Sequence, residues 1–295
     1  TACTVTHDGV SVGVSSTTKD DSGTNRILKV TLSGSVGTTA KDTVVRCSNI
    51  LIPRKVTAAK TNIVIQSTDA SGVVRDEDTS FNLNDVTANV LSSTSGSFSK
   101  SKAGEIGTLT FGFTNFNPIP ANGKIVVTLP NGFDASSVSY SSDSGIPGSV
   151  TLSQNNQILT FTQGSSASQI AASTSISVVI SGLKHPTKSG AVGNLLYKTT
   201  DNRDVSIDEG TFAGITLNPN VLGQTTKNVV HENQKAGSVT FLTTTIRAFS
   251  NPLSNGDIIK LSGFSTDYVF DQGGGPISTA CTVTHDGVSV GVSST

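Results

Sequence analysis

The sequence predicts an all-β protein made of β-sandwich domains in a repeating array, and three observations support this prediction. The stretch Thr1–Thr17 occurs again, letter for letter, at Thr279–Thr295, so the sequence repeats with a period of 278 residues, the distance from position 1 to position 279. Apolar residues alternate with polar ones through much of the chain, and no stretch has sustained helical spacing. Turn signals separate the alternating stretches at intervals of about ten residues, which is typical of β-sandwiches.

Half-buried antiparallel strands are expected where Val, Ile, Leu and Phe occupy every second position. The clearest such stretches are Arg26–Gly34, Gly107–Thr114, Lys124–Pro130, Gln157–Gln163, Ser175–Leu183 and Ser238–Thr245. Between the expected strands lie the turn signals Asp8-Gly9, Asn122-Gly123, Asn131-Gly132, Asn255-Gly256 and Gly273–Pro276. Asn, Asp and Gly favour the left-handed backbone that tight hairpins need, so the strands are predicted to pair as hairpins.

A second repeat lies inside the first. The segments Lys102–Phe133 and Lys235–Phe264 share Lys-Ala-Gly, a strand that carries a phenylalanine (Phe111, Phe241), an Asn-Pro step, an Asn-Gly turn and a closing Gly-Phe, in this order. We therefore interpret the two segments as the same half of two related domains, and we call it the front half.

The remaining residues align as a back half. Ser175–Lys188 aligns with Asp42–Lys55, which places Lys188 on Lys55, and Leu195–Asp201 aligns with Ile63–Asp69. An acidic hairpin and a closing strand follow in both cases. The order of elements is therefore the same in both domains.

These alignments divide the chain into three parts. Residues 1–96 are predicted to be the back half of an immunoglobulin-like domain B, 97–222 a complete immunoglobulin-like domain A, and 223–295 the front half of the next domain B. Short linkers are expected near Ser92–Ser97, a Ser/Thr/Gly-rich break, and near Leu222–Thr226. In this interpretation the sequence is a window cut through a continuing array.

The three cysteines reduce to two per period, because Cys281 is the repeat image of Cys3. In the alignment of the two domains, Cys3 falls on Val138 and Cys47 falls on Ile180, and both of these are apolar. We predict that the two sites face each other across the core and form a disulfide, and that Cys281 pairs with the next repeat. Two free buried thiols are the alternative. A disulfide implies an oxidising compartment.

The composition argues against several classes of partner. Twenty basic and twenty-one acidic residues give a net charge of −1 with no basic stripe, so nucleic acid is not expected. No apolar run approaches the roughly 18 residues of a membrane-spanning helix, so no membrane span is expected. Only 14% of the residues are charged, and Ser, Thr, Asn and Gly supply the polarity instead, as in secreted surface proteins. O-linked glycans on the many hydroxyl groups remain an open alternative.

No catalytic motif is found. The histidines, His7, His185, His231 and His285, have no metal-ligand spacing with one another or with a cysteine, and His185 is expected in an exposed loop. No Gly-x-Ser-x-Gly elbow is present, and the glycines before Pro276 lack the Lys-Ser/Thr of a phosphate-binding loop. We predict a protein without catalysis.

The acidic hairpins are the charged feature that both domains share. The candidate calcium ligands are Asp69, Asp76 and Asp78 in domain B and Asp201, Asp204 and Asp208 in domain A. Carboxylate oxygens are suitable calcium ligands, but neither set has the spacing of a known calcium loop. Solvated turn residues are the other interpretation. Apart from calcium, no cofactor is expected.

The stretch Asn117–Phe133 reads NPIPANGKIVVTLPNGF. In tandem Ser/Thr-rich β-domains it resembles the giant repetitive extracellular proteins of protists and algae and, more loosely, the immunoglobulin-like repeats of microbial adhesins and pili. The resemblance implies an extracellular fibre or stalk, and no catalytic or ligand-binding motif is part of it.

Two functions are therefore considered. The first is a structural subunit of an extracellular filament, with head-to-tail repeats and copies of itself as partners. The second is the shaft of a cell-surface adhesin whose binding site lies on loops or in a tip domain. The repeats either follow one another in a covalent array, or separate chains exchange Thr279–Thr295 for the Thr1–Thr17 strand of a neighbour.

Overall fold

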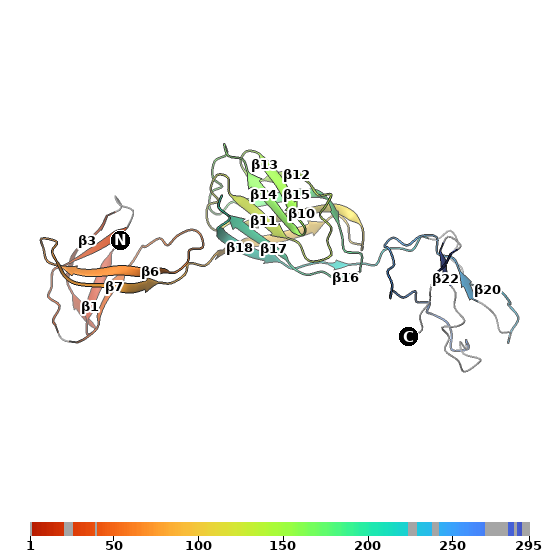
Figure 1. Ribbon diagram of the computed structural model, residues 1–295, viewed down its shortest axis with the longest axis horizontal. Helices are drawn as coiled ribbons and strands as arrows, with labels where there is room; N and C mark the ends of the chain where they lie inside the picture. Colours follow the sequence, from red (N-terminus) through yellow and green to blue (C-terminus); the bar gives the residue numbers. More distant parts are fainter. Residues whose placement is uncertain are drawn as a thin grey trace. The chain divides into compact units, whose positions relative to one another are not determined.

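The computed structural model describes residues 2–20, 26–38, 40–223, 229–237, 242–268, 283–285 and 288–290 (Figure 1). All regular elements in these residues are β-strands, which confirms the predicted all-β class. The chain forms two compact units, Thr1–Asn251 and Pro252–Thr295. None of the described elements is a helix long and apolar enough to cross a membrane.

Domain A is a sandwich of two sheets. One sheet has the strand order β12 (Ser139–Ser144), β15 (Ser175–Lys184), β10 (Ile106–Thr114) and β9 (Ser92–Phe98). The other has the order β13 (Val150–Asn155), β14 (Ile158–Gln163), β11 (Lys124–Thr128), β17 (Leu195–Thr200), β18 (Ser206–Phe212) and β8 (Asn89–Val90). Neighbouring strands are antiparallel, except that β8 runs parallel to β18. The short strands β16 (Gly190–Ala191) and β19 (Thr216–Leu217) pair with each other.

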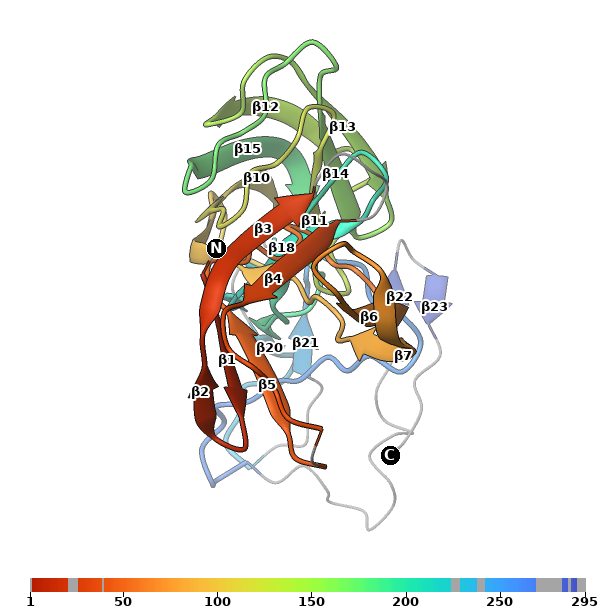
Figure 2. The same cartoon turned by 90° about the vertical axis from the view of Figure 1, so that its left-hand side faces the viewer.

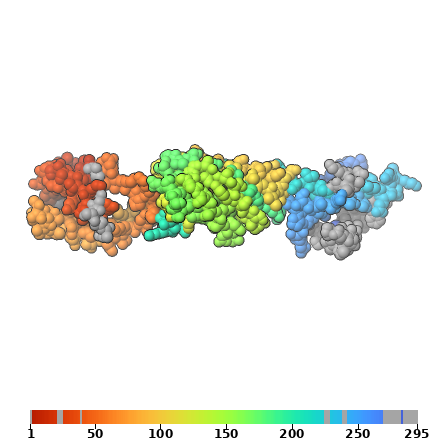
Figure 3. All heavy atoms as spheres, turned by 90° about the horizontal axis from the view of Figure 1, so that it is seen from above, coloured from red at the N-terminus to blue at the C-terminus, as the bar shows by residue number. Residues whose placement is uncertain are grey.

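The core of domain A lies between these sheets, where the inward positions of the alternating strands meet. Phe111 of β10 stacks on Tyr197 of β17 with ring centroids 5.6 Å apart, and it also contacts Phe161 of β14 at 5.4 Å. Burying each large apolar side chain contributes roughly 1.5–3 kcal/mol, so the sandwich is held mainly by this layer. Figure 3 shows the residues of domain A, in yellow to green, as one closely packed body.

Strand β9 corrects the predicted boundary of domain A. The Ser/Thr/Gly-rich run that was interpreted as a linker pairs with β10 along its length, and the preceding Leu91 is buried in the core. A Cβ added to Gly96 would lie 2.7 Å from the ring of Phe212, so only a residue without a side chain fits there. The small residues of this strand are typical of a linker, and at Gly96 the Phe212 ring fills the space where a side chain would lie.

The strands of residues 2–88 form three separate sets, which Figure 2 shows as distinct ribbons. The strands β2 (Val10–Val12), β1 (Cys3–His7) and β5 (Thr43–Cys47) make a three-stranded sheet. The strands β3 (Val14–Asp20) and β4 (Ile27–Leu32) make one hairpin, and β6 (Lys60–Thr68) and β7 (Val74–Leu83) make another. We call residues 2–88 the half-domain.

The expected front half of domain B contains few described strands. Strands β20 (Val229–His231) and β21 (Leu242–Thr244) pair, and Gly223 pairs with Ala248. In the second unit, β22 (Val283–His285) and β23 (Val288–Val290) pair in the register of their repeat images β1 and β2. The turn signal Gly273–Pro276 and the residues Ser238–Phe241 lie outside the described residues.

Candidate self-association surface

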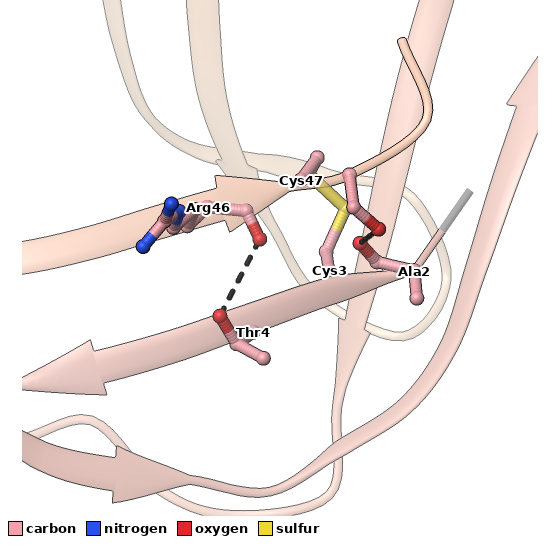
Figure 4. Close-up of a disulfide and its surroundings, with 6 residues drawn as sticks. Ala2, Cys3, Thr4, Arg46 and Cys47 are labelled. Carbon is pink, nitrogen blue, oxygen red and sulfur yellow. Dashed lines mark hydrogen bonds between the residues drawn. A yellow bond between two sulfur atoms is a disulfide. The ribbon is translucent and has the colours of Figure 1, made fainter.

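Cys3 and Cys47 form a disulfide, which is the predicted pairing (Figure 4). They lie directly opposite each other on β1 and β5, with their Cα atoms 4.0 Å apart. The Thr4 hydroxyl donates to the carbonyl of Arg46 beside the bridge, at 3.4 Å. Cys281, which was predicted to pair with the next repeat, lies outside the described residues.

The location of the bridge differs from the prediction. It joins neighbouring strands of one sheet and does not cross the core. In domain A, Ile180, the counterpart of Cys47, pairs with Tyr140, so Tyr140 and not Val138 is the structural counterpart of Cys3. The alignment placed Cys3 on Val138, two residues before its structural counterpart. Positions two residues apart point to the same face of a strand, and both Val138 and Tyr140 pack against the core. The bridge therefore fixes the register of β1 on β5.

The acidic turns of the two domains have the same hydrogen bonds. Oδ1 of Asp201 accepts from the N–H groups of Arg203 and Val205, at 2.9 and 3.0 Å. Oδ1 of Asp69 accepts from those of Ser71 and Val73, at 2.9 Å each. A hydrogen bond from the Ser71 hydroxyl, at 2.7 Å, lowers the pKa of Asp69 most, and the backbone bonds lower it further. The identical turn supports the alignment of Leu195–Asp201 with Ile63–Asp69.

The second carboxylate oxygen of Asp201 binds Lys55, with 2.6 Å between Nζ and Oδ2. Burial raises the pKa of Asp201, but the hydrogen bonds from Lys55 and from the backbone outweigh it and leave the pKa below its ordinary value. Next to this ion pair, the N–H of Val56 donates to the carbonyl of Ser206 at 2.7 Å. The half-domain thus contacts domain A at a specific place.

Asp208 is fully buried and joins the front and back halves of domain A. Its Oδ2 accepts from the N–H groups of Phe116 and Asn117, at 3.1 and 3.0 Å, and its Oδ1 accepts from Nδ2 of Asn117 at 2.8 Å. A buried carboxylate needs such donors, because an unpaired charge is costly there.

The structure separates the calcium candidates instead of gathering them. Asp204 pairs with Lys124 at 2.7 Å, Asp78 accepts from the hydroxyl and N–H of Ser80, and Asp76 accepts from a serine hydroxyl. Across the described ranges, no group of three or more potential metal-binding side chains lies together. Calcium binding stays a prediction, and calorimetric titration of the chain with calcium chloride tests it.

No strand that the structure describes occupies the positions beside β4, β5 and β6 that central strands occupy in domain A. In domain A, β11 pairs with both β14 and β17, and β10 pairs with both β15 and β9. By chain order, β4 corresponds to β14, β6 to β17 and β5 to β15. Among the described strands, none pairs with both β4 and β6, and β5 pairs with β1 alone. Isolated two-stranded hairpins are marginally stable in water, so these edges need a partner.

Several core-facing residues of the half-domain are exposed, although Cys3, Val5 and Val12 are buried. Val45 is 53% exposed, whereas its counterpart Val178 is 0% exposed. Ile65 is 52% exposed against 1% for its counterpart Tyr197. Further exposed apolar residues of the half-domain include Ile27, Leu28, Leu32, Val44, Ile50, Leu51, Ile52, Val64, Phe81 and Leu83. We call the core-facing side of β4, β5 and β6, with Val45 and Ile65, the open face; Val44, the neighbour of Val45 in β5, points to the opposite side. Surfaces this apolar mark interaction sites.

His185 corrects another prediction, because it is 2% exposed and does not lie in an exposed loop. Its ring makes edge contacts with Phe98 and Phe133, with centroids 5.4 and 5.7 Å away, and Nδ1 lies 3.2 Å from the carbonyl oxygen of Lys102. Burial lowers its pKa, and the Lys102 carbonyl and the Glu105 charge offset this only in part.

Comparison with known proteins gives a weak structural similarity. No protein-family model and no curated protein matches the sequence. Among solved structures, the seventh ScaB type I cohesin from Pseudobacteroides cellulosolvens is 12% identical, with a TM-score of 0.25. The match covers 46% of this chain and 98% of the cohesin. A likeness at this level carries no argument about the function of this chain.

Sequence reasoning did not identify the contacts of Asn117 and Lys55. Both residues stood at positions that the two domains share, the Asn-Pro step and the lysine aligned with Lys188. The recurrence of these residues in both domains indicated that they matter, but their hydrogen-bond partners depend on how the strands pack.

Proposed function

We propose that this chain is a structural, non-catalytic subunit of an extracellular filament built from head-to-tail repeats. The observation that supports the proposal is the open face of the half-domain, together with the sequence counterpart of the strands that would cover it, at Lys235–Phe264. One copy offers the face and the next supplies the front half. Because the two surfaces differ, each added copy leaves a new one free, and such heterologous contacts continue as a fibre unless they close into a ring.

Strand addition supplies the energy of this association. Two inserted strands would satisfy the free backbone groups of β4, β5 and β6 and cover their apolar side chains. Each apolar side chain moved from water into a core contributes roughly 1.5–3 kcal/mol. The partners in this proposal are copies of the same chain, and neither nucleic acid nor a cofactor takes part.

The Cys3–Cys47 disulfide supports the extracellular location, because disulfides persist in oxidising compartments. O-linked glycans on exposed hydroxyl groups are compatible with it. Two arrangements give the same fibre: a covalent array of repeats, or separate chains in which Thr279–Thr295 takes the place of Thr1–Thr17.

Sedimentation equilibrium and electron microscopy of the 295-residue chain test the proposal. We expect a mass that grows with concentration and thin unbranched fibres at high concentration. A monomer at every concentration would refute self-association. A denaturing gel of the native protein separates the two arrangements, since separate chains give a band near 30.2 kDa and an array gives a far larger one. Specific glycan binding by the monomer would favour the adhesin shaft instead.

A further inference from the structure

The buried carboxylate of Asp208 has a counterpart in the half-domain. In domain A, Asp208 pairs with Thr199 across β17 and β18, and its N–H donates to the Thr199 hydroxyl oxygen at 3.1 Å. In the half-domain, Asp76 pairs with Ser67 across β6 and β7, and its N–H donates to the Ser67 hydroxyl oxygen at 3.1 Å. Asp76 therefore occupies the position of Asp208 in a hairpin that has the same register beside the turn.

The environments of the two carboxylates differ. Asp208 is 0% exposed and accepts three hydrogen bonds from the Phe116–Asn117 segment. Asp76 is exposed, and its Oδ2 accepts from the Ser67 hydroxyl at 2.6 Å. In the half-domain, the carboxylate thus stands at the place where the front half of a complete domain supplies its Asn-Pro turn.

The counterpart of that turn is Ser250–Asn251. Asn251 precedes Pro252 as Asn117 precedes Pro118, and each step lies in the front half ahead of an Asn-Gly turn. Within a single copy, Nδ2 of Asn251 donates to the carbonyl oxygen of Ala103 at 3.4 Å. A long bond to a neutral carbonyl is weaker than one to a carboxylate, so Asn251 gains when a carboxylate replaces Ala103.

We infer that Asp76 of one copy binds the Ser250–Asn251 segment of a second copy, in the way that Asp208 binds Phe116–Asn117 within domain A. The carboxylate accepts from the two backbone N–H groups and from the Asn251 side chain. This contact sets the register in which the segment Ile258–Leu261 enters between β4 and β6. The inference rests on the proposed self-association and assigns its specificity to one carboxylate.

Isosteric variants of the 295-residue chain test this contact. Asp76→Asn removes the charge from the carboxylate, and Glu77→Gln removes a charge at the next position, which faces away from the contact because side chains alternate along a strand. We expect Asp76→Asn to weaken self-association about tenfold or more in sedimentation equilibrium, and Glu77→Gln less than threefold, because hydrogen bonds to a charged acceptor are the stronger ones. Asn251→Ala should weaken association by a similar factor.

Mixing two variants shows whether the contact joins different copies. In an equimolar mixture of Asp76→Asn and Asn251→Ala chains, the intact Asp76 of one meets the intact Asn251 of the other. We expect this mixture to form dimers that do not extend, at concentrations where each variant alone is monomeric. The melting temperature of domain A, unchanged in all variants, shows that the chains are folded.

The outcomes are distinguishable. Equal association of Asp76→Asn and Glu77→Gln overturns the inference while leaving the proposed self-association intact. A mixture that stays monomeric overturns the assignment to a second copy. A wild-type chain that does not associate at any concentration overturns both proposals together.

Discussion

Domain A and the half-domain share a pattern of strands and turns, but aligned apolar residues that are buried in domain A are exposed in the half-domain. Their hairpins share register and turn hydrogen bonds, as Asp201 and Asp69 show. Yet Val178 is 0% exposed and its counterpart Val45 is 53% exposed. Alternation and turn chemistry thus specify the hairpins, whereas burial depends on central strands that lie far away in the sequence. Domain A contains its own central strands in β10 and β11, whereas no described strand takes these positions beside β4, β5 and β6 of the half-domain.

The largest expected effect comes from truncating equivalent positions in the two regions. Tyr197→Ala removes a buried ring that packs on Phe111 and Phe113 and whose hydroxyl donates to the carbonyl of Ser95 at 2.7 Å. We expect it to lower the free energy of unfolding of domain A by about 3–5 kcal/mol in urea denaturation. Ile65→Ala, at the aligned position, should leave that free energy unchanged and weaken self-association instead.

Two outcomes of these variants would contradict the difference drawn between domain A and the half-domain. If Ile65→Ala lowers the stability of domain A as much as Tyr197→Ala does, the half-domain is not an independent open unit. If Ile65→Ala leaves self-association unchanged, the open face is not the surface that a second copy covers.

The next effect concerns the disulfide. Replacing Cys3 and Cys47 together by Ser should destabilise the β1–β5 pairing by about 3–4 kcal/mol, since the bridge closes a loop with a sequence separation of 44. Hydrogen exchange of β1 and β5 amides should accelerate, with no change in domain A. A non-reducing peptide map of the wild type should show Cys3 linked to Cys47. Complete alkylation of both thiols without reductant would contradict the bridge.

A smaller effect is expected in the pH dependence of the stability of domain A, which contains the buried His185. The pKa of His185 in the folded state lies below its ordinary value of 6.5, because the ring is buried. As the pH falls below about 6.5, the unfolded chain binds a proton that folded domain A does not, so stability falls. We expect the melting temperature of domain A to drop between pH 7 and pH 5.5, and the slope to flatten in His185→Gln. An equal slope in that variant would assign the pH dependence to other groups.

The smallest effect is expected at the Lys55–Asp201 ion pair. The Lys55 side chain is 45% exposed, so Lys55→Ala should cost less than about 1 kcal/mol. The pKa of Asp201 should nevertheless rise, because Lys55 is one of the donors that lower it. Carboxyl chemical shifts followed through a pH titration measure this. An unchanged pKa would show that the backbone N–H groups alone hold the carboxylate ionised.

Sequence reasoning predicted the elements whose causes are local. Alternation located β10, β14 and β15, and the Asp8-Gly9 turn joins β1 and β2 with positive φ at both residues, 52° and 75°. The Cys3–Cys47 pairing followed from the alignment of the two domains.

Features with non-local causes were not predicted. In strand β9, position 96 accommodates only a glycine because the distant Phe212 ring occupies the space beside it. His185 is buried because Phe98 and Phe133, remote in sequence, close around it. Asp208 was read as a solvated or calcium-binding acid, and its donors lie on a turn about 90 residues earlier, with separations of 92 and 91. Such contacts depend on how the two sheets meet.

Hydrogen exchange of the half-domain, followed as a function of protein concentration, shows whether a second copy covers the open face. We predict that amides of β4, β5 and β6 become protected as the chain self-associates and approach the protection of β14, β15 and β17 in domain A, because inserted strands then hydrogen-bond their free edges. If these amides exchange equally fast in the monomer and in the associated state, a second copy does not complete the open face, which contradicts the proposed self-association.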